Sequence, residues 1–264
     1  MTPIRLVSMS ELDGPVSSVA LRAHLLALAD DEHLMGQRHA EWVGAGPFLE
    51  ADIALAGVGL DELAHAAELY ALLAGRADEP VDHLAFDRPP EAFRSCWLVE
   101  YETTDWAKAT VRQWCYDAAE RLRWEQLAEC PIPEVAALAA RILPEEVDHR
   151  THADGLLDVL LDADESRRRV EFALIELWTV ALGQFDPVPE EAKAVAEGLL
   201  PGSVAELTAP WLSEVQRRFP TVDLDLADTA ALEGQAGRTV RHQDFSMVLG
   251  RMRSVLDADP GARW

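Results

Sequence analysis

The sequence predicts an all-α protein built as a bundle of long helices. Apolar residues recur every three or four positions over long segments, and no segment of convincing length alternates apolar and polar residues as a strand does. The connections between the long segments are short, which favours antiparallel neighbours. With 264 residues, 49% of them hydrophobic, and no visible domain boundary or internal repeat, we expect a single helical domain over residues 1–264.

The first long helix is expected over residues 17–43. Its apolar residues lie on one face: Leu21, Leu25, Leu28 and Met35. The turn at 44–47, which contains two glycines and a proline, ends this helix. A second helix, rich in Ala and Leu, is expected over 50–73, where Gly57 and Gly59 would let a neighbouring backbone approach closely.

A second pair of long helices is expected further along the chain. Residues 76–90 carry three prolines among charged residues and predict a loop, which a short helix at about 91–100 follows. The long helices are expected over 105–129 and 134–162, and a tight proline-containing turn at 130–133 joins them. Antiparallel hairpins are therefore predicted at both ends of the loop.

A proline and several shorter helices complete the predicted architecture. Pro144 lies inside the helix at 134–162, where it removes one backbone donor, so we expect a kink rather than a break. Shorter helices are expected at 168–185, 189–199, 203–218 and 241–256. These segments add C-terminal helices to the four long ones.

Composition excludes several classes of protein. The net charge of −24 would repel a phosphate backbone, so nucleic acid and anionic membrane surfaces are not expected partners. The three cysteines form no C-x-x-C pair, which argues against a disulfide framework or a zinc ribbon. No stretch approaches 18 uninterrupted apolar residues, and the N-terminus lacks the apolar core of a signal peptide. We therefore expect a cytoplasmic protein that does not enter the membrane.

Two copies of one short motif suggest a metal site. Glu62 and His65 are three residues apart on one long helix, and Glu146 and His149 repeat this spacing on another. Residues i and i+3 share a helix face, so each pair can present a carboxylate and an imidazole to the same point. A single Glu-x-x-His is weak evidence. Two copies on different long helices are typical of four-helix dimetal carboxylate sites.

Matched positions along the hairpins predict the remaining carboxylates. Glu32 and Glu62 each lie 12 residues from the first turn, about 18 Å along their helices, so they are level across the hairpin. Asp117 and Glu146 each lie 13 residues from the second turn. The predicted ligands are therefore these four acids and the two motif histidines. Glu120, one turn beyond Asp117, is the alternative on its helix.

Other interpretations of these acids exist. Glu32 lies in the acidic run 30–32, which would be a solvated surface if it were not also in the apolar stripe. Without a metal, the buried carboxylates would need protons or ion pairs, for which Arg38, Arg112 and Arg121 are candidates. Oxygen and nitrogen donors with no thiolate favour two iron ions, with manganese or a mixed Fe/Mn pair as alternatives.

Several segments resemble a known family. They are Gly36–Gly44, Leu49–Ala56 and Gly59–Asp61, together with Gly237-Arg238, His242, Leu249, Met252 and the ending Pro260–Trp264. These residues resemble the phenylacetate catabolic protein family, in particular the C-type subunits of ring 1,2-phenylacetyl-CoA epoxidases. The resemblance implies a ferritin-like four-helix bundle with additional C-terminal helices. It also implies assembly, either as a homo-oligomer or as a heteromer with a ferritin-like paralogue, and a possible reductase partner.

The resemblance carries two functional hypotheses. C-type subunits are typically metal-free structural partners, whereas the run Glu145–His149 resembles the Glu-Glu-x-x-His of the catalytic A-type subunits. The first hypothesis is a di-iron oxygenase that uses O2 on an aromatic or acyl substrate, such as a CoA thioester. The alternative is a non-catalytic subunit that stabilises a catalytic paralogue. A CoA site would need a local basic patch, with these candidates: Arg94, Arg112, Arg121 and Arg123.

Overall fold

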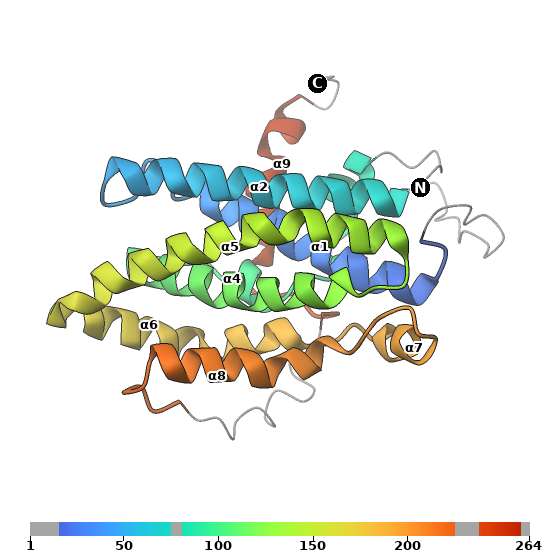
Figure 1. The fold of residues 1–264 in the computed structure, drawn as a ribbon. Helices are drawn as coiled ribbons and strands as arrows, with labels where there is room; N and C mark the ends of the chain where they lie inside the picture. The colour runs from blue at the N-terminus through green and yellow to red at the C-terminus, as the bar shows by residue number, and fades with distance from the viewer. Residues whose placement is uncertain (1–15, 75–80, 225–237, 260–264) are drawn as a thin grey trace.

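Four long helices form the centre of the molecule. The computed structural model describes residues 16–74, 81–224 and 238–259, and these residues contain helices and connections but no strand. The four helices are α1 (Val19–Ala40), α2 (Leu49–Ala74), α4 (Trp106–Ala128) and α5 (Pro133–Asp162). Helices α1 and α2 pack as one hairpin, and α4 and α5 pack as the other (Figure 1). The predicted all-α, ferritin-like bundle is confirmed.

Local sequence signals explain where these helices begin. Ser18 caps α1, because its hydroxyl accepts a hydrogen bond from the backbone N–H of Leu21. The Asp105 carboxylate caps α4 in the same way, 3.0 Å from the N–H of Lys108. Pro133 is the first residue of α5, where a missing N–H has no cost. Helix α5 continues without a break through Pro144 to Asp162, as predicted.

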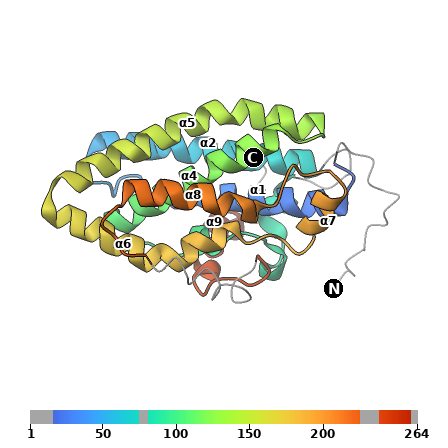
Figure 2. The same cartoon turned by 60° about the horizontal axis from the view of Figure 1, so that its bottom comes forward.

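The C-terminal helices cover one side of the bundle. Helices α6 (Asp164–Leu182) and α8 (Thr208–Arg218) pack on α4, and α7 (Glu191–Ala196) and α9 (Phe245–Ala258) contact α1. Figures 1 and 2 place α6 and α8 across the bundle from α2. Helix α2 packs mainly on α1, with further contacts to α5 and the π-helical turn His83–Asp87. None of the described helices is long and apolar enough to cross a membrane.

The segment between the hairpins differs from its prediction. Residues 83–87 form a π-helical turn rather than a loop, and residues 75–80 lie outside the described part of the chain. The helix expected at 91–100 is a 3-10 turn (Pro90–Ala92), an extended stretch and the short helix α3 (Trp97–Glu100). The stretch is extended because the N–H groups of Arg94 and Cys96 donate to the buried carboxylates of Asp30 and Asp31, each over 2.7 Å.

Two glycines bring α1 and α2 together. A Cβ atom on Gly36 would lie 2.8 Å from Leu63 Cγ, and one on Gly59 would lie 3.1 Å from the Cβ of His39. The prediction of close approach is therefore confirmed at Gly59. It is wrong within this chain at Gly57, which faces outward with no heavy atom within 4 Å of a Cβ position. The close contact sets α1 and α2 at the separation that the site needs.

A buried arginine attaches the segment before α9 to the bundle. Arg238 lies 2.9 Å from Asp31 on α1, and its other N–H groups donate to the carbonyl oxygens of Arg94, Gln184 and Asp186. Only 5% of its surface is exposed. An ion pair this deeply buried is costly to break, because either partner would be left charged in a nonpolar environment.

Candidate metal centre

Seven side chains meet in the interior of the four-helix bundle. They come from all four long helices and form the carboxylate–histidine cluster: Glu32, Glu62, His65, Asp117, Glu120, Glu146 and His149. Each is buried, and none is more than 3% exposed. The structure thus brings together all six residues that the spacing singles out, and also Glu120. The level positions across each hairpin explain this arrangement.

Glu146 lies between the two histidines. Its Oε1 atom is 3.4 Å from His65 Nδ1, and its Oε2 atom is 3.7 Å from His149 Nδ1. The two imidazole rings are tilted toward each other with centroids 6.2 Å apart. A carboxylate in this position has one oxygen for each side of the cluster.

The other carboxylates divide between two overlapping groups. Glu32, Glu62 and His65 can each offer one donor atom within 4.8 Å of the others, and so can Glu62, Asp117 and Glu120. Glu62 belongs to both groups and also lies 3.8 Å from His149 Nδ1. Either group could hold a metal ion. Asp117 and Glu120 are both in place, so the geometry keeps both as donors from α4.

An outer acid holds each histidine from the opposite hairpin. His65 Nε2 on α2 lies 2.7 Å from Glu145 on α5, and His149 Nε2 on α5 lies 3.2 Å from Asp61 on α2. A carboxylate accepts hydrogen bonds, so these contacts place the N–H on Nε2. The lone pair of each Nδ1 then faces the cluster, which is the arrangement that a metal-binding histidine requires.

Burial and mutual repulsion alter the acidity of the cluster. Burial raises the pKa of Glu62 well above its ordinary value, and the nearby Glu32 carboxylate raises it further. Burial is also the main cause of the raised pKa values of the other three glutamates, and neighbouring carboxylates add to it: Glu32, Glu120 and Glu146. Burial raises the pKa of Asp117 to about 7. Without a cation, this cluster retains protons near neutral pH.

The cluster has unused donor atoms and lacks protein cations that would satisfy them. Both oxygens of Glu32, Glu62, Asp117 and Glu146 are buried without a hydrogen-bond partner, as is Nδ1 of both histidines. The predicted arginine partners are engaged elsewhere. Arg38 binds Glu41 and Glu102, Arg112 donates to the Tyr101 carbonyl, and Arg121 binds Glu125 and Glu214. Buried, unpaired oxygen and nitrogen atoms fit two divalent cations.

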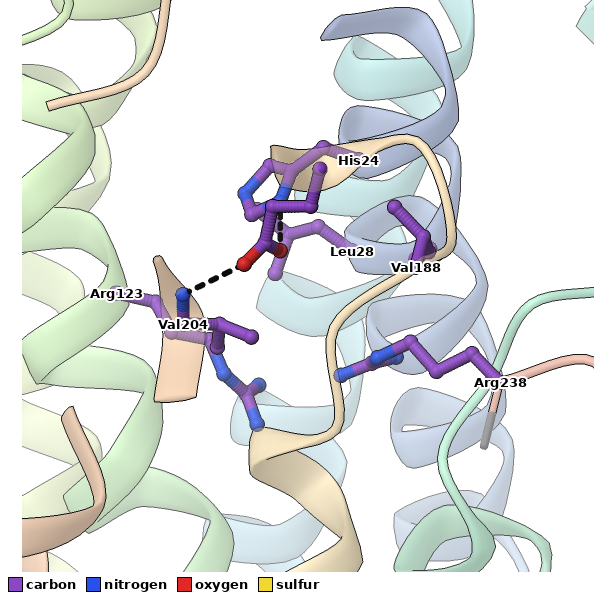
Figure 3. Close-up of a pocket in the computed structure, with 8 residues that line it drawn as sticks. His24, Leu28, Arg123, Val188, Val204 and Arg238 are labelled. Atoms are coloured by element: carbon purple, nitrogen blue, oxygen red, sulfur yellow. Dashed lines mark hydrogen bonds and ion pairs between the residues drawn. The ribbon is translucent and has the colours of Figure 1, made fainter. Parts of the chain in front are cut away.

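The predicted basic patch for CoA is not formed. Arg112 and Arg123 are buried, Arg121 is neutralised by its two glutamates, and Arg94 donates to the backbone carbonyls of Glu91 and Phe93. Arg123 instead points into a small pocket opposite Arg238, beside the ion pair between His24 and Glu191 (Figure 3). This pocket has room for about 20 Å³, which suits one water molecule and not a nucleotide.

Comparison with known proteins identifies the family. The family model described as "Phenylacetic acid catabolic protein" matches residues 9–264. The chain belongs to this family. Its relatives include the C-type subunit of 1,2-phenylacetyl-CoA epoxidase from Escherichia coli (strain K12), to which it is 30% identical over 248 residues. The match covers 92% of this chain and 99% of that relative. The predicted resemblance to phenylacetate catabolic proteins of the C type is therefore confirmed.

Within this family member, the outer acids are the functional residues that sequence reasoning missed. Asp148 and His152 are the acid and histidine that flank the second motif, but Asp148 is exposed on α5. The acids that do hold the histidines directly precede each motif, at Asp61 and Glu145. The signal was therefore an acid before each Glu-x-x-His.

Proposed function

We propose that this chain is a dimetal carboxylate protein with oxygenase-type chemistry. The observation that carries the proposal is the set of buried, unpartnered carboxylate oxygens and imidazole Nδ1 atoms on four helices. Glu32, Glu62 and His65 are the proposed ligands from the first hairpin. Asp117, Glu146 and His149 are the proposed ligands from the second, with Glu120 available beside Asp117.

Each residue has a proposed role that follows from its position. Glu146 and Glu62 lie between the two groups of donors, so they would bridge two ions, and each histidine would bind one ion through Nδ1. Asp61 and Glu145 would keep the imidazoles oriented and their Nε2 atoms protonated. Four ligand carboxylates balance the charge of two divalent ions. Iron is the proposed metal, with manganese or Fe/Mn as alternatives.

The proposed reaction class is O2-dependent oxidation of an aromatic or acyl substrate, possible substrates including CoA thioesters. Two bound iron ions would supply the electrons and open coordination positions that activation of O2 requires. The protein would exclude water, because every cluster residue is at most 3% exposed. The name of the E. coli relative, an epoxidase of phenylacetyl-CoA, supports this substrate class. An external reductase would provide reducing equivalents.

A structural role is the second candidate function. It is favoured by the match to almost the whole of a C-type epoxidase subunit, which makes assembly with a ferritin-like paralogue a reasonable alternative. In that case the chain would bind metal but would not oxidise a substrate by itself. Reduced, metal-loaded chain supplied with O2 and phenylacetyl-CoA separates the two functions, because only the enzyme gives an oxidised product without a second type of chain.

Metal content tests the proposal directly. We expect two metal ions per chain in protein loaded anaerobically with Fe(II), and loss of metal in Glu62→Ala and His149→Ala variants. A Glu68→Ala variant is the matched control, because Glu68 is on the same helix as Glu62 but about half exposed. Circular dichroism establishes that each variant is folded. A folded wild-type chain that takes up no iron or manganese would overturn the assignment.

A further inference from the structure

The outward face of α2 is apolar along its whole length. Exposed residues recur at helical spacing and define the α2 face: Leu49, Ile53, Gly57, Leu60, Ala64, Ala67 and Ala71. Leu49, Ile53 and Leu60 are 69%, 63% and 68% exposed. The C-terminal helices lie on the other side of the bundle and leave this face uncovered (Figures 1 and 2). A continuous exposed apolar face on an otherwise strongly acidic protein indicates an interaction surface.

The two halves of the α2 face have complementary sizes. The large side chains lie in the N-terminal half up to Leu60, and the exposed residues after Leu60 are alanines. We propose that a second copy of this chain packs on this face, antiparallel, with the two-fold axis at Leu60. Leu60 then meets its own copy, while Ile53 faces Ala67 and Leu49 faces Ala71 of the second copy. Such an interface is self-complementary, as two-fold symmetry requires.

A groove lies where the proposed arrangement needs one. Beside the C-terminal half of the α2 face, Ala71 and Leu72 line a groove of about 480 Å³ together with Ala137, Leu138 and Arg141 of α5. Leu49 of the second copy would enter it, and by symmetry the groove of that copy would receive Leu49 of the first. A large exposed side chain and an apolar groove are thus matched twice in one dimer.

The charges at the edge of the face agree with this orientation. Helix α2 has no Lys or Arg in its 26 residues, and Glu50 is exposed near its N-terminus. Arg141 lies beside the C-terminal half, in an ion pair with Glu68, and is 47% exposed. The antiparallel arrangement brings Glu50 of the second copy next to Arg141. Repulsion between chains of charge −24 is screened beyond about 8 Å at physiological salt.

The size of the surface is sufficient for a stable dimer. At about 1.5 Å per residue, α2 is about 39 Å long, and with the adjoining edge of α5 the face is about two helices wide. That corresponds to roughly 800 Å² on each copy, the contribution of one partner to an interface of standard size. The inference does not depend on the proposed metal centre.

Oligomeric state and a matched pair of variants test the proposal. Sedimentation velocity of the full chain in 0.15 M NaCl is expected to give a dimer. Leu60→Lys places two like charges at the two-fold axis and is expected to weaken dimerisation at least about tenfold. Val159→Lys is the control, because Val159 is 67% exposed on α5 outside the face, and it is expected to leave the dimer intact. Circular dichroism verifies that both variants fold.

Disulfide formation gives an independent positive result. Oxidation of a Leu60→Cys variant is expected to produce a covalent dimer, because the two copies of this position meet at the axis. A Val159→Cys variant is not expected to do so, and the native cysteines Cys96, Cys115 and Cys130 are buried. An Arg141→Glu change should weaken the dimer, and adding Glu50→Lys should restore it. A monomeric wild-type chain, or a dimer that Leu60→Lys leaves unchanged, would overturn the proposal.

Discussion

The Nε2 atom of His65 lies 2.7 Å from a carboxylate oxygen of Glu145, which belongs to the other hairpin. The reverse contact joins His149 to Asp61 over 3.2 Å. Each hairpin therefore orients the imidazole of the other. In both cases the acid directly precedes the glutamate of its own Glu-x-x-His motif, so the two motifs are related by an approximate exchange of hairpins.

Removing either outer acid is expected to weaken metal binding while the ligands remain. For Asp61→Ala and Glu145→Ala we expect affinity for Fe(II) to fall about 10- to 100-fold, because the imidazole loses the contact that orients it. Competition with a chromogenic chelator measures this change. Asp148→Ala is the control, since Asp148 is exposed on the same helix as Glu145. Equal affinities in all three variants would contradict the orienting role.

The two acids of α4 are expected to differ in importance. Glu120 interacts with Glu32, Glu62 and Glu146 at the centre of the cluster, whereas Asp117 interacts with Gln113 and Arg150 at its edge. We therefore expect Glu120→Ala to reduce the iron content by about half and Asp117→Ala to retain most of it. Elemental analysis of the loaded variants measures the difference. The reverse order would identify Asp117 as the principal ligand from α4.

The metal-free protein is expected to lose stability as pH rises. The pKa of Asp117 is raised to about 7, and the pKa values of the four cluster glutamates are raised well above 4.5, so the folded chain binds more protons than the unfolded chain. This contribution is complete below pH 4 and is lost as pH rises through the raised values. Thermal unfolding between pH 6 and 8.5 should show a falling Tm in the metal-free chain.

Bound metal should remove that trend, because the cations take the place of the protons. An Asp117→Asn variant serves as an internal check, since it should reduce the slope in the metal-free state. A Tm that rises with pH in the metal-free wild type would show that the cluster is ionised without a cation.

Gly36 is expected to tolerate no larger residue. A Cβ atom there would lie 2.8 Å from Leu63 Cγ and 3.0 Å from the Gly59 carbonyl oxygen, so α1 and α2 would have to separate. We expect Gly36→Ala to lower the free energy of unfolding by about 1–3 kcal/mol. Gly155→Ala, with open space around it, should instead raise it by about 0.5–1 kcal/mol. Urea unfolding measures both values, and similar effects would contradict the close packing.

The buried pair of Arg238 and Asp31 is expected to contribute strongly to the stability of the fold. Arg238→Ala would leave Asp31 with the N–H of Cys96 and with Arg123 at 3.8 Å, so we expect a loss of about 3–5 kcal/mol. Arg168→Ala removes an exposed ion pair and should cost less than about 1 kcal/mol. Chemical unfolding compares the two, and equal costs would mean that the C-terminal segment is not anchored at Arg238.

Much of the fold was predictable because helical periodicity is a local property. The four long helices begin and end within three residues of their predicted bounds. The extended stretch before α3 was not predictable, since it depends on hydrogen bonds to Asp30 and Asp31, more than 60 residues away in the sequence. Likewise, the choice between Gly57 and Gly59 as the contact glycine depends on which side of α2 meets α1.

The candidate site was predictable in its centre and not at its edge. Level positions on two hairpins bring Glu32 and Glu62 together, and the same holds for Asp117 and Glu146, because an antiparallel pair converts equal distances from the turn into equal heights. Asp61 and Glu145 escaped prediction because their contacts cross between hairpins. No spacing within one hairpin reports how the second is rotated against it.

The crossed contacts between the hairpins also impose an order on maturation. The first hairpin has no partner for His65 until Glu145 has been synthesised, more than 70 residues after α2 ends. A nascent chain that exposes only α1 and α2 therefore has an unoriented imidazole and an incomplete set of donors. Capture of a metal ion becomes an event that follows pairing of the hairpins, so metal uptake during refolding would act as a clock for tertiary assembly.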